Sequence, residues 1–386
     1  MIKVVHSISR LAGGPAYRTV LLAEHMQKMG YENILIHGSL DKWDPLNFEK
    51  KEFNFETIHL PTMKRNIYPF KDTAALYHFV KLFRQIKPDI VHTHQSKDGI
   101  LARLAAKITG VPVILRTYHG LVYYDNYFGL KTKLIRPIFL NLERACNLFT
   151  DQIIAISKIQ GREIATDFKL TVPDKITVVP NSFILEPFLK STRSKILHEQ
   201  FGLDPKAVIL TCVANFQPPK DHQNVLKAFN LFRARNPEIN PHLILVGSGP
   251  LQPEVENWIK EMELSDSVYL TGYRSDIPEI YAASDLALLG SKSEGTPGSL
   301  IEALAAGIKV VSTEVGGIRD VLNDGNWGTL CSPRNYRALA GALETEFSLN
   351  RDHSRIQQEV QKKYGVANVA ELMDKLYKHL LSENSQ

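Results

Sequence analysis

The chain has 386 residues, of which 44% are hydrophobic and 23% are charged; this is ordinary for a globular protein and long enough for two domains. It contains no apolar run near the roughly 18–20 residues of a membrane-spanning helix, and its first apolar stretch is too short for a signal peptide. The three cysteines (Cys146, Cys212 and Cys331) are too far apart for a disulfide framework or a zinc site, which favours a reducing cytoplasm.

The net charge of +5 hides a difference between the two halves of the chain. Residues 1–185 hold 25 Lys and Arg against 16 Asp and Glu, and residues 186–386 hold 21 against 25. The first half should therefore attract an anionic partner or surface more than the second. Basic residues scattered over solvated faces would give the same count, so this alternative stays open.

The first half alternates strand and helix patterns. Expected strands cover 3–8, 32–37, 89–94, 111–117, 153–157 and 176–180. Expected helices cover 17–29, 73–86 and 99–109, and the pair Gly13-Gly14 is expected to form a turn before the first of them. This alternation predicts an α/β domain with a parallel sheet and helices on both faces.

A second α/β series follows a boundary expected near 181–200. Strands are expected at 208–214, 242–246, 268–271, 286–289 and 308–313, and helices at 223–236, 255–262, 277–283, 300–306 and 318–322. The tail, 366–381, is expected to be an amphipathic helix whose apolar stripe consists of Val369, Leu372, Met373, Leu376 and Leu380.

The segment 290–319, GSKSEGTPGSLIEALAAGIKVVSTEVGGIR, carries the clearest functional signal. A loop with two glycines and a proline leads into a helix, and a helix start approached by such a loop can bind a diphosphate through its backbone N–H groups. Glu294 and Glu302 lie on either side, and ionised glutamates accept hydrogen bonds from hydroxyl groups. The pattern indicates a sugar nucleotide site. The alternative is an acidic helix start with a second glutamate on an exposed face.

Several motifs, in this order along one chain, resemble the family-four retaining glycosyltransferases, which have the GT-B fold. They are GGPAYRTVLLAEHMQKMGY near the N-terminus, DIVHTH, YHG, IIAIS, VPNSF, VGSGP, LTGYRSDIPEIYAASDL, and SEGTPGSLIEALAAG with VVSTEVGGIRDV after it. The resemblance implies two Rossmann-like domains facing across a cleft. It assigns 1–185 to acceptor binding and 186–365 to nucleotide-sugar binding, and it implies that the helix 366–386 crosses back onto the first domain.

The resemblance also implies roles for individual residues in binding the donor. Glu302 looks like the ribose-binding glutamate, and Glu294 like the glutamate near the donor sugar. Lys220 lies where the family places a lysine that pairs with the phosphates, and His119 resembles the histidine beside the donor sugar. His119 and Glu294 are the expected catalytic residues. Other donor-binding positions implied by the motifs are Gly14, Gly247, the nucleobase positions Gly272, Tyr273 and Arg274, and the backbone N–H groups of Gly298, Ser299 and Leu300.

Two positions depart from the family pattern. Asn215 and Gln217 stand where members have an arginine, so one cationic phosphate contact is expected to be missing at Asn215. Thr296-Pro297-Gly298 stands where many members have an aromatic residue, and this leaves the choice of sugar open. Outside the family pattern, Lys220 alone would be an ordinary surface lysine, and His119 would simply complete the end of a strand.

No metal site is expected from the sequence. The chain contains no Asp-x-Asp pair of the kind that holds a cation on a diphosphate, so the helix start and Lys220 would offset the phosphate charge. His92 and His94 alternate along a strand and point to one face, but no third ligand has a usable spacing. We expect a metal-independent reaction without cofactors, in which a nucleoside-diphosphate sugar, with UDP favoured, is the donor.

The segment 118–144 mixes aromatic and basic residues. They are Tyr123, Tyr124, Tyr127, Phe128, Lys131, Lys133, Arg136 and Arg144. Such a mixture suits peripheral contact of the first domain with a membrane interface, or an acceptor with a lipid-phosphate anchor. A mobile acceptor loop followed by an ordinary helix explains the pattern equally well.

The expected function is a retaining, hexosyltransferase-type glycosyltransferase that moves a sugar from a nucleoside diphosphate to a hydroxyl acceptor. The expected setting is bacterial surface polysaccharide or lipid-linked oligosaccharide synthesis, in the cytoplasm or at the inner face of the cell membrane, with no nucleic-acid partner. The alternatives are a sugar-nucleotide 2-epimerase and a sugar-nucleotide-binding protein without catalysis. A nicotinamide dehydrogenase is disfavoured because Gly13-Gly14 lacks the G-x-G-x-x-G spacing.

Overall fold

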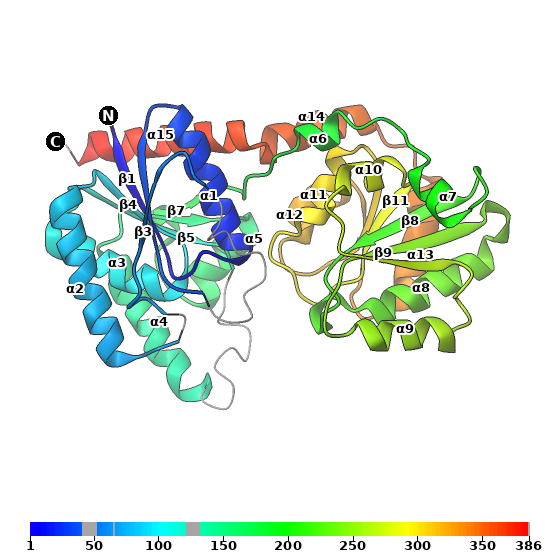
Figure 1. Ribbon diagram of the computed structural model, residues 1–386, viewed down its shortest axis with the longest axis horizontal. Helices are drawn as coiled ribbons and strands as arrows, with labels where there is room; N and C mark the ends of the chain where they lie inside the picture. The colour runs from blue at the N-terminus through cyan, green and yellow to red at the C-terminus, as the bar shows by residue number, and fades with distance from the viewer. Residues whose placement is uncertain (41–51, 65, 121–131, 385–386) are drawn as a thin grey trace. The chain divides into compact units, whose positions relative to one another are not determined.

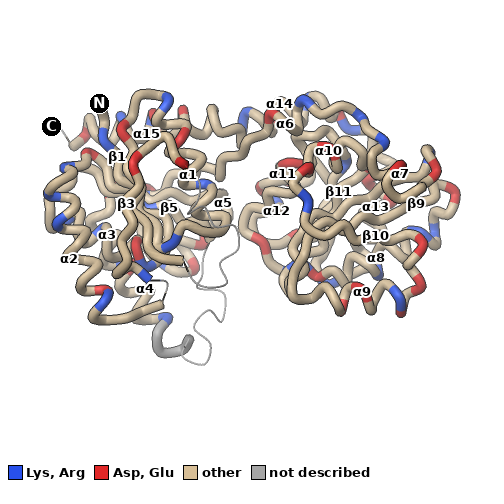
Figure 2. The backbone as a smooth tube through the Cα atoms, viewed as in Figure 1, with Lys and Arg blue, Asp and Glu red and all other residues tan. Residues whose placement is uncertain are grey.

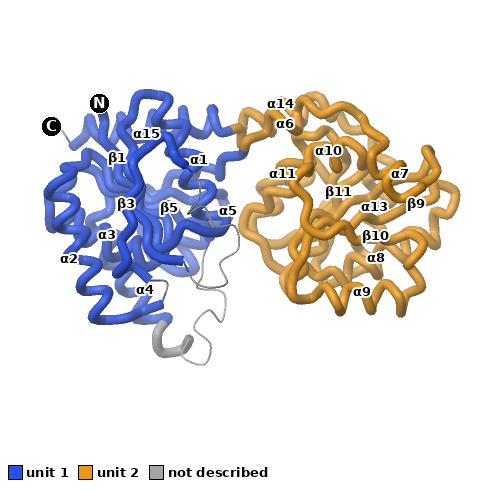
Figure 3. Tube along the Cα trace, viewed as in Figure 1, with its two compact units in different colours: residues 1–183, 366–386 blue, residues 184–365 orange. Residues whose placement is uncertain are grey.

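The structure is a computed structural model that describes residues 1–40, 52–64, 66–120 and 132–384. The chain divides into two compact units, each built on its own parallel sheet (Figures 1 and 3). Unit 1 comprises 1–183 and 366–386, and unit 2 comprises 184–365. The α/β class expected from the sequence is therefore observed, with one sheet in each unit.

Unit 1 holds a seven-stranded sheet in the order β3-β2-β1-β4-β5-β6-β7, and all its pairings are parallel. Its strands are β1 (Lys3–Ile8), β2 (Glu32–His37), β3 (Glu56–His59), β4 (Ile90–Thr93), β5 (Val113–Tyr118), β6 (Gln152–Ala155) and β7 (Ile176–Val178). Its helices are α1 (Gly13–Lys28), α2 (Pro69–Ile86), α3 (Ser96–Thr109), α4 (Thr132–Leu148), α5 (Lys158–Arg162) and α15 (Val366–Glu383).

Unit 2 holds a six-stranded parallel sheet in the order β10-β9-β8-β11-β12-β13. Its strands are β8 (Val208–Val213), β9 (Pro241–Val246), β10 (Val268–Gly272), β11 (Leu286–Leu289), β12 (Lys309–Thr313) and β13 (Thr329–Cys331). Its helices are α6 (Glu186–Leu189), α7 (Ile196–Phe201), α8 (His222–Arg235), α9 (Gln252–Glu261), α10 (Ile277–Ala282), α11 (Gly298–Ala305), α12 (Ile318–Val321), α13 (Tyr336–Ser348) and α14 (His353–Tyr364).

The C-terminal helix α15 completes the core of unit 1, where it packs beside α1 (Figure 1). Its residues Val369, Met373, Tyr377 and Leu380 are buried in one cluster with residues of β1, β4 and β5. Their spacing of three or four residues places them on one face of a helix. The expected apolar stripe is wrong at Leu372, which is 44% exposed. Tyr377, which was not expected in the stripe, is buried in the core cluster.

Other differences from the expected elements have local causes. The pair Gly13-Gly14 is not a turn before the helix but the first turn of α1 itself, although Gly13 keeps a left-handed φ of +77°. Helix α2 begins at Pro69, four residues earlier than expected, because proline suits the first turn of a helix. Strands β3 and β13 and helices α13 and α14 were not expected, and β3 has an exposed pattern that lacks alternation.

Charged residues of both signs are interspersed along the elements of each unit (Figure 2). None of the helices that the structure describes is both long and apolar enough to cross a membrane.

Candidate functional site

In unit 2 the site lies at the point where the strand order reverses. Strand β8 pairs with β9 on one side and with β11 on the other, and ligands of open α/β sheets bind at such a point, beyond the carboxyl ends of the strands. The loops that follow β8 and β11 meet there. Lys292 N donates to the carbonyl of Pro219 at 2.7 Å, and its Nζ lies 2.8 Å from Asp221.

Two of the expected site residues form an ion pair across these loops. Lys220 Nζ donates to Glu294 Oε1 at 2.6 Å, and Ser291 Oγ donates to the same oxygen at 2.6 Å. The Glu294 side chain is only 8% exposed. Lys220 and Glu294 therefore satisfy each other, and a phosphate that binds Lys220 must compete with this carboxylate.

Helix α11 begins beside this pair with its backbone N–H groups uncapped by any described side chain. The N-terminal N–H groups of a helix lack acceptors within the helix, so those of Gly298, Ser299 and Leu300 are available to a ligand. Tyr281 is buried and its hydroxyl donates to Ser299 O at 2.8 Å, which fixes this first turn. Glu302 follows one turn later. Burial raises the pKa of Tyr281 well above its usual value, and the charge of Glu302 adds to this.

The loop that carries Glu294 packs directly against the backbone at Gly316. Gly317 N donates to Gly295 O at 3.0 Å, and Thr313 Oγ1 donates to Ser291 O at 2.7 Å. Gly316 has a φ of +52°, and a Cβ there would lie 1.8 Å from the carbonyl oxygen of Glu294. Only glycine fits this position, because any side chain would push the Glu294 loop away.

Gly316→Ala should therefore displace the Glu294 loop, and it should lower stability by at least about 1–2 kcal/mol through its left-handed φ alone. We expect a lower midpoint of thermal unfolding and weaker binding of any ligand that contacts Glu294. Gly341→Ala in α13 is the matched control, because its Cβ would meet no described atom within 4 Å. Equal behaviour of the two variants would refute the supporting role of Gly316.

The remaining expected residues of unit 2 lie at neighbouring strand ends. Gly247 N donates to Gly272 O at 2.9 Å, which joins the ends of β9 and β10. Tyr273 is 71% exposed, and Arg274 is engaged by Asp276 and Gln200. Asn215 is exposed at the end of β8, in the loop that leads to Lys220.

In unit 1 a pocket of about 360 Å³ lies at the corresponding reversal between β1 and β4. It brings together two expected site residues, Gly14 and His119. The other lining residues are Ser9, Arg10, Ala12, Gly13, Pro15, Ile67, His94, Gln95, Ser96, Lys97, Arg116, Gly120 and Phe139. The lining combines apolar side chains, cationic groups and the start of α3.

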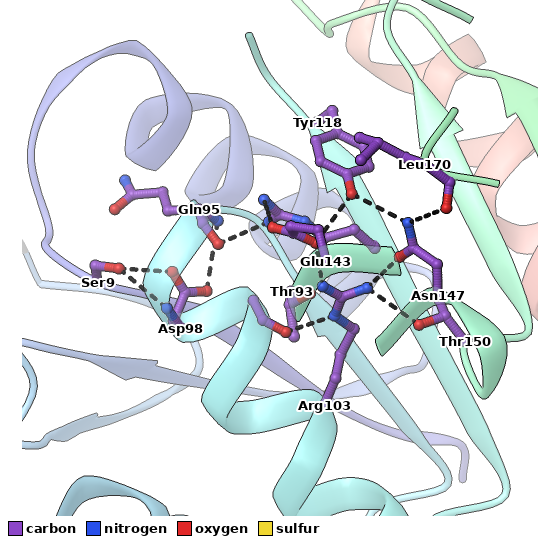
Figure 4. Close-up of polar contacts among 12 residues, drawn as sticks. Ser9, Thr93, Gln95, Asp98, Arg103, Tyr118, Glu143, Asn147, Thr150 and Leu170 are labelled. Carbon is purple, nitrogen blue, oxygen red and sulfur yellow. Dashed lines mark hydrogen bonds and ion pairs between the residues drawn. The ribbon is translucent and has the colours of Figure 1, made fainter. Parts of the chain in front are cut away.

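A buried cluster of charged groups holds one wall of this pocket (Figure 4). Glu143 Oε2 accepts hydrogen bonds from Arg103 and from the Tyr118 hydroxyl, the latter at 3.0 Å, and Glu143 Oε1 lies 3.6 Å from Arg116. Arg116 donates to Gln95 O at 2.7 Å, at the start of α3. Burial raises the pKa of Tyr118 to about 12. The cluster anchors the residue that precedes His119, and none of its members was expected from the sequence.

The expected pair of histidines has a third partner, which the sequence analysis missed. His6, His92 and His94 are buried, and their ring nitrogens lie within 4.8 Å of one another, as metal ligands would. His6 comes from β1, which pairs with β4, and the register places His6 opposite His92. All six ring nitrogens nevertheless make hydrogen bonds within the protein, so the group lacks a lone pair free for a metal.

Part of the aromatic and basic segment 118–144, residues 121–131, lies outside the described residues. Tyr123, Tyr124, Tyr127, Phe128 and Lys131 belong to that part, and the Lys133 side chain is also outside the described structure. Arg144 donates to the carbonyl groups of Phe168 and Lys169, so it serves the packing of α4.

Most of the chain matches models of known protein families. Residues 12–186 match the family model Glycosyltransferase Family 4, and residues 194–363 match Glycosyl transferases group 1. A UDP-Gal:alpha-D-GlcNAc-diphosphoundecaprenol alpha-1,3-galactosyltransferase of Escherichia coli is 32% identical over 260 residues, which are 67% of this chain and 66% of that protein.

Solved structures share the whole fold at lower identity. A glycosyltransferase from Rickettsia africae has a TM-score of 0.79 at 21% identity, over 98% of each chain. Anabaena Alr3699/HepE in complex with UDP-glucose has a TM-score of 0.74 at 18% identity, over 98% of this chain and 100% of that one. The expected architecture of two Rossmann-like parallel-sheet domains is confirmed.

Proposed function

Because the chain belongs to the family 4 glycosyltransferases of glycosyl transferases group 1, we propose that it transfers a sugar from a nucleoside diphosphate to a hydroxyl group, with retention at the anomeric carbon. A UDP-sugar is the favoured donor. The name of the relative from Escherichia coli includes UDP-Gal, and the Anabaena structure is a complex with UDP-glucose. The observation that carries the proposal is the meeting of Lys220, Glu294 and the uncapped start of α11 at the strand-order reversal of unit 2.

Unit 2 would bind the donor. The N–H groups of Gly298, Ser299 and Leu300 would hold the diphosphate, where the helix dipole favours negative charge. Glu302 would accept hydrogen bonds from the ribose and Glu294 from the sugar hydroxyls. Lys220, which now donates to Glu294 at 2.6 Å, would exchange this carboxylate for a phosphate oxygen.

Unit 1 would bind the acceptor in the pocket between β1 and β4. The apolar side chains Ile67 and Phe139 and the cationic Arg10 line it together. This mixture suits a hydroxyl acceptor that carries a lipid and a phosphate, such as the diphosphoundecaprenol named in the relative from Escherichia coli. We propose an acceptor of that class, in surface polysaccharide or lipid-linked oligosaccharide synthesis, and contact with the cytoplasmic membrane face through unit 1.

The chemical step would depend on charge that develops on the leaving diphosphate. As the bond to the anomeric carbon breaks, negative charge grows on the phosphate oxygen, and preorganised N–H donors together with a lysine stabilise it where it forms. The leaving phosphate would accept the proton of the attacking hydroxyl on the same face of the sugar, which gives retention without an enzyme nucleophile. His119 would contact the donor sugar rather than form a covalent bond.

Lys220→Ala should slow turnover by about tenfold or more, because it removes one charge-assisted contact worth about 1.5–3 kcal/mol to the leaving phosphate. The measurement is steady-state release of nucleoside diphosphate in the presence of acceptor. Lys227→Ala, on the exposed side of α8, is the control and should turn over at the wild-type rate. A wild-type rate in Lys220→Ala would remove Lys220 from the mechanism.

The reaction itself is tested by incubating the protein with UDP-sugars and a lipid-diphosphate-linked GlcNAc acceptor. Transfer predicts UDP release that requires the acceptor and a product with the anomeric configuration of the donor. UDP release without acceptor would indicate an epimerase instead. Donor binding without release on any acceptor would indicate a binding protein, in keeping with Asn215 at the position of the missing arginine.

A further inference from the structure

Three histidines form a continuous row of hydrogen bonds through unit 1. His6 Nδ1 lies 3.1 Å from His94 Nε2, and His94 Nδ1 lies 3.1 Å from His119 Nε2. The row ends on two asparagines, because His6 Nε2 lies 3.1 Å from Asn33 Oδ1 and His119 Nδ1 lies 3.1 Å from Asn181 Oδ1. His6 and His94 are buried, whereas His119 is partly exposed in the pocket between β1 and β4.

The polarity of this row, which is the direction in which each hydrogen bond runs from donor to acceptor, is fixed at its buried end by a backbone group. The backbone N–H of Asn33 can only donate, and it meets the Gln27 side chain at 2.9 Å, so the Gln27 atom there is the oxygen. The Asn33 side chain meets the same oxygen at 3.2 Å and must present its Nδ2 to it. Asn33 therefore presents its oxygen to His6, and His6 Nε2 carries the proton.

The tautomer of each neutral imidazole determines the tautomer of the next ring in the row. A neutral ring has one N–H donor and one acceptor, so His6 Nδ1 accepts and His94 Nε2 must donate to it. His94 Nδ1 then accepts from His119 Nε2, which leaves the Nδ1 of His119 with a lone pair directed at Asn181. Burial lowers the pKa of His6 and of His119 to about 4. Burial and the neighbouring histidines lower the pKa of His94 well below its usual value, so all three rings are neutral at pH 7.

We propose that His6 and His94 are positioning residues that hold His119 in its Nε2–H form, with the Nδ1 lone pair as its remaining acceptor, under the control of Gln27 and Asn33. His92 is excluded from the row, because its ring nitrogens are bonded to Tyr377 and Thr117, both at 2.7 Å. The buried part of the row ends at Asn33, so it sets a tautomer and does not conduct a proton through unit 1.

The fixed tautomer has a consequence for Asn181. The structure places Asn181 Oδ1 against His119 Nδ1. With three neutral rings of this polarity, the Asn181 amide must instead be turned so that its nitrogen donates to His119 Nδ1. With its oxygen presented, the row must hold one additional proton. Burial lowers the pKa of His119 and opposes that proton most, and the charges of Arg116 and Arg18 act in the same direction, against the Asn181 contact, which raises this pKa. The neutral row is therefore the resting state.

Which groups of a ligand His119 can bind is inferred on the basis of the proposed function. A His119 that offers only a lone pair at Nδ1 accepts a hydrogen bond from a sugar hydroxyl that displaces the Asn181 amide, and it repels a carboxylate or a phosphate oxygen. The row would thus tune His119 for hydroxyl groups of an uncharged sugar. Gln27, on α1, would influence sugar binding through four successive hydrogen-bonded side chains, those of Asn33, His6, His94 and His119, without contacting the sugar.

The test reads the tautomers directly by nitrogen NMR of ¹⁵N-histidine-labelled full-length protein at pH 7. The His119 signals are assigned as those that a His119→Gln variant lacks. Gln27→Met removes the oxygen that orients Asn33, and Gln27→Glu keeps an acceptor at the same place as the matched control. Backbone spectra and thermal midpoints establish that each variant is folded.

We expect His119 to be neutral and Nε2–H in the wild type and in Gln27→Glu, and to shift towards Nδ1–H in Gln27→Met, where Asn33 can turn. The Gln27→Met variant should also lose about twofold to tenfold in kcat/KM, the worth of one neutral hydrogen bond. Wild-type His119 that is cationic or Nδ1–H, or His119 signals unaffected by Gln27→Met, would overturn the proposal. Because the NMR result needs no substrate, correct tautomers in a protein that binds no sugar nucleotide would contradict only the proposed function.

Discussion

Glu143→Ala should lower the free energy of unfolding of unit 1 by about 3–5 kcal/mol, the largest stability loss that we expect in this protein. Glu143 is fully buried, and the guanidinium groups of Arg103 and Arg116 lie beside its carboxylate. Removing the carboxylate leaves the buried guanidinium groups of Arg103 and Arg116 without the negative charge that they pair with. The remaining acceptors of Arg103, which are Gly99 O, Asn147 Oδ1 and Thr150 Oγ1, are uncharged.

The loss should extend from stability to the pocket, since the Tyr118 hydroxyl also donates to Glu143 and His119 follows directly in the chain. Calorimetry of the variant against the wild type measures the effect. Glu32→Ala is a suitable control in the same unit, because the Lys3–Glu32 pair lies at the surface, partly exposed, and surface pairs contribute about 0–1 kcal/mol. Equal unfolding midpoints for the two variants would show that the buried cluster does not stabilise unit 1.

Glu302→Ala should weaken donor binding by about 1.5–3 kcal/mol, as expected for the loss of a hydrogen bond to a charged group. The carboxylate lies one turn inside α11, beside the uncapped N–H groups that would hold the diphosphate. The effect should appear equally for UDP and for the UDP-sugar, because the ribose is common to both. Calorimetric titration of each ligand measures it.

Two further variants make the Glu302 result specific. Glu302→Gln keeps one acceptor oxygen without the charge, and it should fall between the wild type and Glu302→Ala. Glu261→Ala, at the exposed end of α9, should bind as the wild type does. Donor affinity unchanged in Glu302→Ala would remove this residue from the binding site.

The donor half of the site could be predicted because its information is local in the sequence. Strand β11, the glycine loop and α11 follow one another within twenty residues, and each has a strong pattern. The ion pair of Lys220 with Glu294 required the resemblance, since 74 residues separate the two. Only the strand order of unit 2 shows why they meet, and that order is a long-range property.

The interior of unit 1 could not be predicted in the same way. His6, Glu143 and Arg103 are polar residues that lie on β1, α4 and α3, and nothing near them in the sequence identifies their partners. His6 bonds to Asn33 of β2 and to His94 after β4, and Glu143 of α4 bonds to Arg103 of α3 and to Tyr118 of β5. These contacts depend on the order of the strands and on the packing of the helices on them. The Gly13-Gly14 pair misled for a related reason: glycines suggest a turn, but packing on the sheet extends α1 through them.

The claim that unit 2 binds a nucleoside-diphosphate sugar is tested most directly by thermal unfolding with UDP-, GDP- and ADP-sugars in the presence of EDTA. At 100 times its dissociation constant a bound donor should add about 2.7 kcal/mol of stability. We predict such a shift with a UDP-sugar, a smaller one in Glu302→Ala, and none with the free sugar. Absence of a shift with every sugar nucleotide, with or without divalent metal, would contradict the account.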